Sequence, residues 1–232
     1  MNRKLWFMLI YGFVLLGFAG SAIGLGNAVT VMSESVPPDR DICFVIDAGH
    51  GGEDGGATSC TGLLESNINL EISLRLNDLM HLLGLKTRMI RTTDISVYTE
   101  GETIAAKKVS DLKERVRIIN STKNAVLVSI HQNYFEQEQY AGAQVFYGKN
   151  ESGKLLAMQI QNSLVHTLNS GSKRTIKPAA GIYLMQHVTC PAILIECGFL
   201  SNFEEEFKLR DPQYQKNLCC VIAAELAVYA NT

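Results

Sequence analysis

Short apolar runs separated by longer helical patterns fill most of the chain after residue 40, and they constrain its fold more than any other feature. The runs are rich in strand-forming residues. Most of them lack the polar alternation of a strand with one solvated face, and strands that are buried on both faces have this pattern. We predict strands at residues 42–47, 85–91, 125–131, 143–147, 182–185 and 192–197.

Helical patterns lie between these runs. The first is a stripe of leucines at helical spacing that ends at Gly84, a residue suited to a C-cap. The last opens with Asp211 and Pro212, which suit an N-cap and a first helical position. Strands that alternate with helices predict an α/β fold, with a mostly parallel twisted sheet and helices on both of its faces. The expected helices are the one that carries the leucine stripe at 70–83 and starts near Glu65, and those at residues 111–120, 152–168 and 212–229.

The N-terminal segment has a different character. Arg3 and Lys4 precede an apolar stretch at 5–16, and small residues follow at 17–28. This order is typical of a secretory signal peptide. If the glycines are counted, the apolar run reaches about Leu25 and is also roughly long enough for an uncleaved membrane anchor. Either interpretation predicts export and an extracytoplasmic location, with membrane contact only through this segment. We expect a signal peptide or membrane anchor at 1–28, a linker at 29–40 and a single domain at 41–232.

Charge and cysteine content narrow the functional class. The formal net charge is −2, and the lysines and arginines are scattered, which argues against a nucleic-acid-binding protein. Six cysteines in an exported chain raise the question of disulfides. Cys43 and Cys197 lie inside apolar runs, and a domain of this size can build a core without crosslinks. We therefore expect buried free thiols, while one disulfide remains open.

A glycine-rich loop follows the first expected strand. Residues 47–57 read DAGHGGEDGGA, and His50 lies just past the carboxyl end of the strand. Ligands of open α/β sheets bind at this edge, and glycines let the backbone pass close to a ligand or a metal ion. A phosphate-binding loop is a rival interpretation, but its spacing and its terminal lysine are missing. Taken alone, the segment also fits a plain turn with a surface histidine.

Three more polar residues lie at comparable places. His131 and Glu196 each end an apolar strand, and Glu65 stands at the start of the leucine-striped helix. An ionised Glu196 is costly to bury unless it has a cation, a donor or a catalytic role. Glu65 alone would fit a favourable partner of the helix dipole. The remaining histidines are expected in helices or in a loop, with structural or solvent-facing roles: His81, His166 and His187.

Together these residues predict a metal site. Two histidines and one glutamate suit a three-ligand zinc centre with an open fourth position for water. The other glutamate can act as the general base, because zinc brings the pKa of water towards ~7. Their joint placement at one edge of a sheet is much stronger evidence for a metal site than any single motif.

These segments resemble the zinc-dependent N-acetylmuramoyl-L-alanine amidases. The family pattern D-x-G-H-G-G-x-D-x-G-A appears at 47–57, S-x-H-x-N at 129–133 and P-x-x-L-x-E-x-G-F-x-S-N at 191–202. A downstream glutamate of the family corresponds to Glu65. The resemblance extends from about residue 42 to the C-terminus.

The resemblance implies specific roles. It implies Zn²⁺ on His50, Glu65 and His131, with Glu196 as the catalytic glutamate. It also implies that residues 41–232 form a zinc amidase catalytic domain. The expected substrate is peptidoglycan, cut at the amide bond between N-acetylmuramic acid and L-alanine.

Two segments narrow the resemblance further. DLKER at 111–115 and GIYLMQ at 181–186 look most like the germination-specific amidases of spore-forming bacteria. Those enzymes strip peptides from muramic acid of the spore cortex, so that deacetylation and lactam closure follow. The resemblance implies this role in sporulation and germination, in the cell wall or in the forespore intermembrane space.

The chain departs from the family in two places. Tyr134 and Phe135, then EQEQ at 136–139, follow the S-x-H-x-N motif where the family often has a small residue, so we expect a reshaped groove beside the site. Only residues 148–152 separate the run at 143–147 from the next helix, which leaves no room for the self-blocking helix of some members. If activity is restrained, an outside protein partner or limited metal loading must restrain it.

Other functions stay open from the sequence alone. A zinc peptidase that cuts within the stem peptide could use the same four polar residues. A non-catalytic wall-binding module is a second alternative, although retention of all four residues argues against it. A membrane-tethered partner subunit is a third, which the N-terminal segment does not exclude.

Overall fold

Six strands run through residues 41–232, the part of the chain that the computed structural model describes. The sheet has the order β2-β1-β3-β6-β4-β5. All neighbouring strands pair in parallel except β4 and β6, which are antiparallel. The expected mostly parallel sheet is confirmed. The strands are β1 (Cys43–Ala48), β2 (Thr87–Met89), β3 (Ala125–Asn133), β4 (Gln144–Tyr147), β5 (Lys177–Pro178) and β6 (Ala192–Phe199).

The central strands β1, β3 and β6 are apolar because both of their faces are covered. Val45 pairs with Leu127, and the two residues pack in the core on one face of the sheet. Their neighbours Ile46 and Val128 pair in the same register and pack in the core on the opposite face. This double burial explains the weak polar alternation of the sequence.

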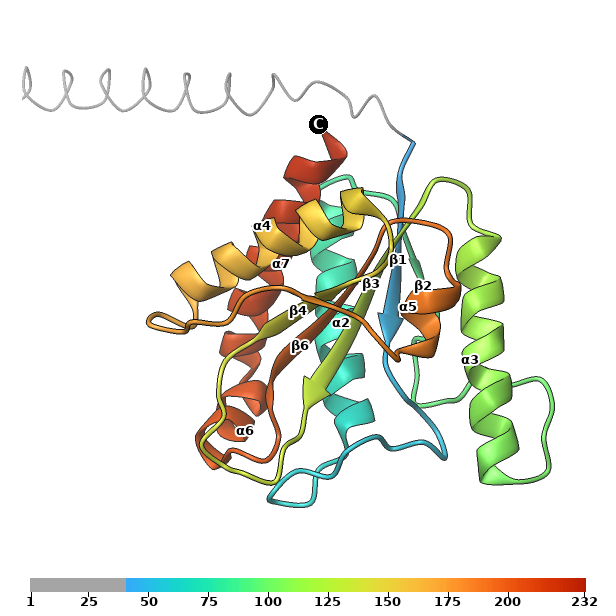
Figure 1. Ribbon diagram of the computed structural model, residues 1–232, viewed down its shortest axis with the longest axis horizontal. Coiled ribbons are helices and arrows are strands. Elements are labelled where there is room, and N and C mark those ends of the chain that lie inside the picture. The colour runs from blue at the N-terminus through green and yellow to red at the C-terminus, as the bar shows by residue number, and fades with distance from the viewer. Residues whose placement is uncertain (1–40) are drawn as a thin grey trace, which may run out of the picture. The chain divides into compact units, whose positions relative to one another are not determined.

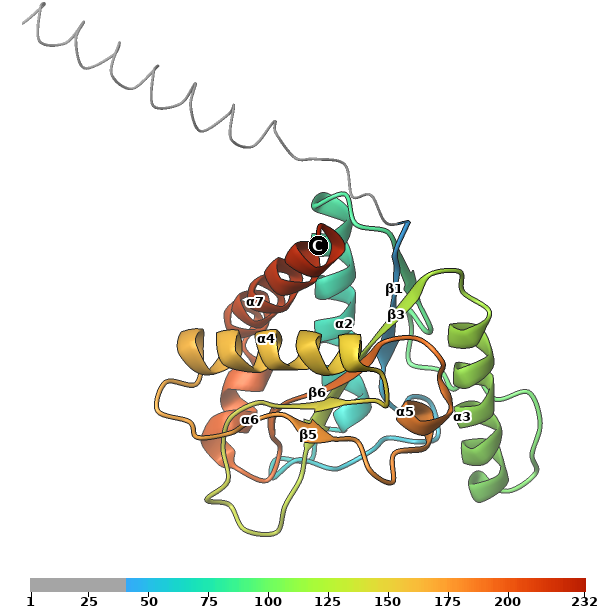
Figure 2. The same ribbon diagram turned by 45° about the horizontal axis from the view of Figure 1, so that its top comes forward.

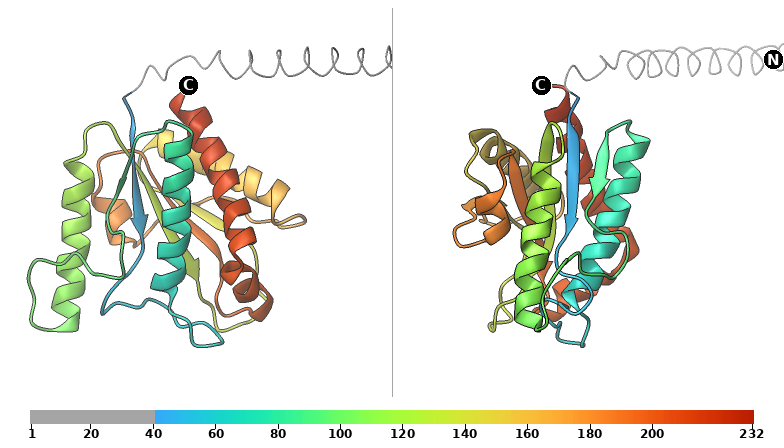
Figure 3. Two further views of the ribbon diagram at one scale, coloured as in Figure 1. Left: turned by 180° about the vertical axis from the view of Figure 1, so that it is seen from behind. Right: turned by 90° about the vertical axis from the view of Figure 1, so that its right-hand side faces the viewer.

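Helices cover the two faces unequally. In the larger core, α2, α4, α6 and α7 pack against one face, and α2 lies beside α7 in the view from behind (Figure 3, left). In the smaller core, α3 and α5 pack against the other face, where they are neighbours (Figures 1 and 2). The helices are α2 (Glu65–Leu82), α3 (Ile104–Asn120), α4 (Glu151–Thr167), α5 (Tyr183–His187), α6 (Phe203–Arg210) and α7 (Pro212–Ala230).

The strand predicted at 182–185 is wrong, because this segment forms the short helix α5. Gly181, with a φ of 83°, precedes it, and the rings of Tyr183 and His187 stack with centroids 3.9 Å apart. His187 therefore lies in a helix and not in a loop. A short apolar run packs equally well as a strand or as a helical turn, so periodicity alone could not separate them.

One helix begins earlier than predicted, and α6 was not predicted at all. Helix α2 begins at Glu65, which confirms the expected place of this residue at the start of the leucine-striped helix. Helix α3 begins at Ile104 and not at residue 111, where Thr103 caps it through a hydrogen bond from the Ala106 N–H. The predictions for α4 and α7 hold to within one residue.

The structure bears on the expected membrane segment and on the state of the cysteines. No helix within residues 41–232 combines the length and apolar character that a membrane span requires. The signal peptide or anchor expected at 1–28 and the linker at 29–40 lie outside the described residues. All six cysteines are free thiols, and Cys43, Cys197 and Cys219 are buried.

Candidate metal centre and active site

Three side chains from three elements converge at the carboxyl edge of the sheet. His50 follows β1, Glu65 opens α2 and His131 lies near the end of β3. One potential ligand atom from each residue lies within 4.8 Å of the other two. The two imidazole rings are 5.0 Å apart between centroids and meet edge to face. The structure thus brings together the three residues that the sequence singled out.

Two glycines make this convergence sterically feasible. A Cβ at Gly49 would lie 2.2 Å from His131 Nε2, and one at Gly56 would lie 2.6 Å from Glu65 Oε2. Neither contact is compatible with a side chain in the present arrangement. His50 itself has a φ of 61°, a backbone conformation that non-glycine residues rarely adopt and that is often found at functional sites.

Glu65 is a buried carboxylate with many partners. Its Oε1 lies 3.0 Å from His131 Nδ1 and accepts hydrogen bonds from Asn69 Nδ2 and the Gln132 N–H. Its Oε2 accepts from the Ala57 N–H and lies 3.3 Å from His50 Nε2. Burial alone would raise the pKa of Glu65, but its contacts with the two histidines outweigh burial and lower it. Glu65 is therefore held as an anion.

His50 is oriented by a second carboxylate. Its Nδ1 lies 2.9 Å from Asp54 Oδ2, which leaves Nε2 turned towards Glu65. Burial lowers the pKa of His50, but its hydrogen bonds to Asp54 and Glu65 outweigh this and raise the pKa to about 9. A carboxylate on the outer nitrogen of an imidazole fixes the ring and the donor atom, as in many metal sites.

Two buried arginines hold the backbone of the His50 loop. Arg91 donates to the carbonyl oxygens of Ala48 and Gly49. Arg115 donates to the carbonyl of His50 and forms ion pairs with Asp47 and Asp111. Sequence reasoning gave neither arginine a role. Arg115 belongs to the DLKER segment at 111–115, but its partner Asp47 is 68 residues away in the sequence.

Glu196 lies beside the cluster in a different environment. It pairs with His131 in the register of β3 and β6, so both side chains project from the same face. Its Oε2 is buried and has no hydrogen-bond partner within residues 41–232. Burial raises the pKa of Glu196 to about 7, with His131 and His50 opposing the shift and Glu65 adding to it. This carboxyl group is poised to exchange a proton near neutral pH.

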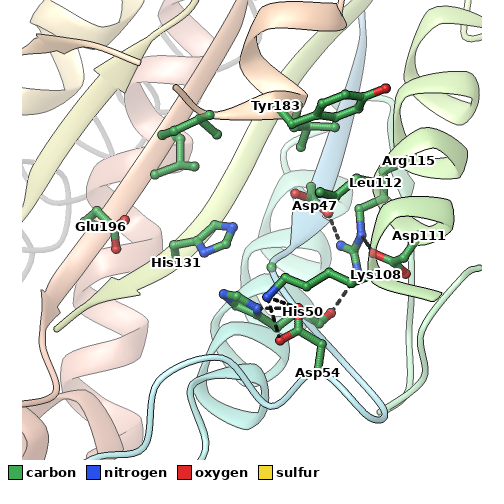
Figure 4. Close-up of a pocket in the computed structure, with 14 residues that line it drawn as sticks. Asp47, His50, Asp54, Lys108, Asp111, Leu112, Arg115, His131, Tyr183 and Glu196 are labelled. Carbon is green, nitrogen blue, oxygen red and sulfur yellow. Dashed lines mark hydrogen bonds and ion pairs between the residues drawn. The ribbon is translucent and has the colours of Figure 1, made fainter. Parts of the chain in front are cut away.

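A cavity of about 300 Å³ opens over these residues. His50, His131 and Glu196 line it from the sheet edge, and α3 and α5 supply the remaining walls (Figure 4). In the close-up, Arg115 extends from α3 towards Asp47, and Lys108 reaches towards Asp54. A ligand in this cavity would contact the two histidines and Glu196 at once.

The donor set fits a divalent metal ion. Two imidazoles and one carboxylate commonly hold Zn²⁺ in catalytic sites, where a further coordination position stays open for water or substrate. The outer contacts of Glu65 and of His50 are already satisfied by backbone N–H groups and by Asp54. The unpartnered Oε2 of Glu196 is left free for chemistry beside the cluster.

Comparisons with known proteins place these features in a family. Residues 44–227 match the family model described as N-acetylmuramoyl-L-alanine amidase. The chain is 36% identical over 225 residues to the germination-specific N-acetylmuramoyl-L-alanine amidase of Bacillus subtilis, covering 96% of this chain and 93% of that protein.

Solved structures agree with this assignment. The CwlD amidase of Clostridioides difficile, in complex with the GerS lipoprotein, superposes with a TM-score of 0.78 at 38% identity, over 82% of this chain and 98% of that chain. An N-acetylmuramoyl-L-alanine amidase from Clostridium difficile 630 superposes with a TM-score of 0.71 at 29% identity, over 81% and 96% of the two chains. The described domain, its site and these likenesses together show that the chain is an enzyme of the N-acetylmuramoyl-L-alanine amidase family.

Proposed function

We propose that this amidase uses one Zn²⁺, held by His50, Glu65 and His131, and that Glu196 moves the proton in the reaction. The bond hydrolysed joins the lactyl carbonyl of N-acetylmuramic acid to the nitrogen of L-alanine. The observation that carries the proposal is the buried, unpartnered Oε2 of Glu196 beside three convergent metal-binding side chains.

The protein residues divide the work. Bound zinc would supply Lewis acidity for activating water and polarising the carbonyl. Glu196 accepts the proton of the attacking water and then delivers it to the leaving nitrogen of L-alanine. Asp54 keeps His50 in the orientation in which Nε2 faces the cluster, and Arg115 fixes the backbone that carries it.

Digestion of purified peptidoglycan, with and without added Zn²⁺, tests the reaction. Mass spectrometry of the products is expected to show glycan that has lost L-alanine, and free peptides that begin with it. A zinc peptidase would instead leave L-alanine on muramic acid. A non-catalytic wall-binding module would release neither product.

We further propose that the enzyme is exported and acts on spore cortex, where peptide removal precedes formation of muramic lactam. The proposal is supported by the likeness to the germination-specific amidase of B. subtilis over nearly the whole chain. Muropeptide analysis of spores from a deletion strain is expected to show cortex without muramic lactam. Normal lactam content in that strain would contradict the role.

A protein partner or limited metal loading is proposed as the restraint on activity. Helix α4 begins at Glu151, four residues after β4 ends at Tyr147, so no self-blocking helix is inserted between them. The C. difficile amidase in complex with a lipoprotein supports the idea of a partner. Full activity of the purified protein with zinc alone would remove the need for one.

A further inference from the structure

A second cavity, of about 390 Å³, opens beside the carboxyl ends of β3 and β6. Its walls come from the ends of β3 and β6, from the segment that follows β3, and from the segment around β5. The tyrosine and phenylalanine residues that depart from the family pattern begin the segment after β3. The lining residues are Asn133, Phe135, Tyr140, Arg174, Lys177 and Phe199.

Strand register places this cavity about two residues along β3 from the active site. His131 pairs with Glu196, and further along the same strands, past a shift in register, Asn133 pairs with Phe199. Two residues along a strand correspond to about 7 Å. This is the length of roughly two residues of an extended peptide. A peptide whose first amide lies at Glu196 can therefore extend into the second cavity.

Aromatic rings form one wall of the cavity. Phe135 and Tyr140 meet edge to face with centroids 5.0 Å apart, and Tyr140 stacks on Phe199 at 6.1 Å. Phe135 is about half exposed, at 49%, so its ring is available to a ligand. Such rings offer an apolar surface for the aliphatic part of a ligand.

Two cations complete the lining. The Arg174 guanidinium lies 4.6 Å from the Phe199 ring centroid and donates to the Ala141 carbonyl and to Gln144 Oε1. Its Nη2 has no partner within residues 41–232. Lys177 is exposed, and its ammonium makes no hydrogen bond or ion pair with the described residues.

No carboxylate lines this cavity to neutralise the two cations. Glu205 is the acidic group that acts on Arg174 from α6, but it is buried. Its Oε2 already accepts hydrogen bonds from the N–H groups of Gly142 and Phe199. The open donors of Arg174 and Lys177 are thus left for an anion from outside.

The geometry points to a subsite in which Arg174 and Lys177 bind a free carboxylate of the peptide stem, one or two residues beyond the amide that is cut. Guanidinium groups match planar carboxylates well, and the aromatic wall covers the carbon chain between carboxylate and amide. This inference rests on the proposed function, because it assumes that the peptide leaves the first cavity at Glu196.

Two synthetic muramoyl tripeptides test the subsite. They differ only at the second residue, which carries either a free α-carboxylate or the corresponding carboxamide. The zinc-loaded full chain is expected to cleave the carboxylate form with a kcat/KM about tenfold higher, as for one charged hydrogen bond. Lys177→Gln and Arg174→Gln are expected to lower kcat/KM for the carboxylate form more than for the carboxamide form, so that this preference shrinks towards one. Lys173→Gln removes the same charge from an exposed neighbour outside the cavity and should leave the preference intact.

Binding of the two free tripeptides, measured by calorimetry, separates this proposal from the proposed function. If neither muramoyl peptide is cut but the carboxylate tripeptide binds more tightly in an Arg174-dependent way, the reaction is wrong and the subsite stands. Equal cleavage and equal binding of both forms would overturn the subsite. So would a preference that survives both variants, or variants that slow both substrates alike.

Discussion

Glu65 and Glu196 both lie beside His131, yet the protein treats these two carboxylates in opposite ways. Glu65 receives hydrogen bonds from backbone and side-chain donors on both oxygens, and its pKa is lowered. Glu196 has a buried oxygen without any partner in the described part of the chain, and its pKa is raised to about 7. A carboxylate held as an anion suits a metal ligand, whereas one that is costly to ionise suits proton transfer.

The contrast arises from where each residue enters the site. Glu65 lies in the first turn of α2, between the glycine-rich loop, whose Ala57 N–H donates to it, and the end of β3, whose Gln132 N–H also donates to it. Glu196 lies within β6, whose N–H and C=O groups are engaged by neighbouring strands. Backbone donors are thus open to one carboxylate and closed to the other.

The largest effect is expected from removing the charge of Glu65. Glu65→Gln should lower zinc affinity by more than the roughly 10–100-fold typical of residues that only support ligands, and activity should be lost with it. Metal analysis and kcat measured on the purified variant check this. Asp78→Asn, an exposed charge removal on the same helix, is the matched control and should change neither quantity. Normal zinc content in Glu65→Gln would show that Glu65 is not a metal ligand and would contradict the contrast with Glu196.

The four polar residues of this site could be predicted from the sequence. Three of them follow or end an apolar run, and Glu65 opens a helix. His50, His131 and Glu196 lie at or near the carboxyl ends of parallel strands, and these ends meet at a common edge of the sheet. The side chains of one edge are neighbours whatever the loops between them do. The family resemblance, and not the spacing, chose Glu65 over Glu196 as the metal ligand.

The supporting network could not be predicted in the same way. Arg115 reaches Asp47 across 68 residues, and no local pattern marks an arginine on an ordinary helix as buried. The short helix at Tyr183–His187 was also missed, because five residues carry too little periodicity. The second cavity depends on loop conformations that the sequence indicated only as a departure after Asn133.

A smaller effect is expected from Arg115, which supports the His50 side of the site and not Glu196. Arg115→Met breaks buried ion pairs and should lower the free energy of unfolding by about 3–5 kcal/mol. It should also weaken zinc binding by roughly tenfold, because the carbonyl of His50 loses its donor.

Denaturant unfolding and a zinc titration measure both effects. Activity of the folded variant is expected to recover at saturating zinc, since Glu196 is intact. Arg117→Met, an exposed arginine on the same helix, is the control. A loss of kcat that excess zinc does not restore would show that Arg115 acts in another way.

The smallest expected effect is on the pH dependence of stability, and it comes from a third carboxylate, Asp47. Like Glu65, Asp47 is buried and has a lowered pKa. Burial would raise the pKa of Asp47, but the charge of Arg115, together with His131 and hydrogen bonds from Ser129 and Arg115, outweighs burial and lowers it. A lowered pKa adds stability that is complete above the unfolded value of about 4 and is lost as pH falls through the folded value. Asp47→Asn should therefore destabilise the protein at pH 7, and its difference from the native chain should shrink below about pH 4. Urea unfolding at several pH values checks this, and a difference independent of pH would refute it.

The division of labour between the two glutamates is tested most directly by measuring zinc affinity and kcat together in Glu196→Gln. The account predicts zinc affinity close to that of the native protein and a kcat lowered by about 10²–10⁴-fold, because a proton acceptor is lost while the ligands remain. Zinc affinity that falls as it does in Glu65→Gln, or a kcat that stays unchanged, would contradict the account.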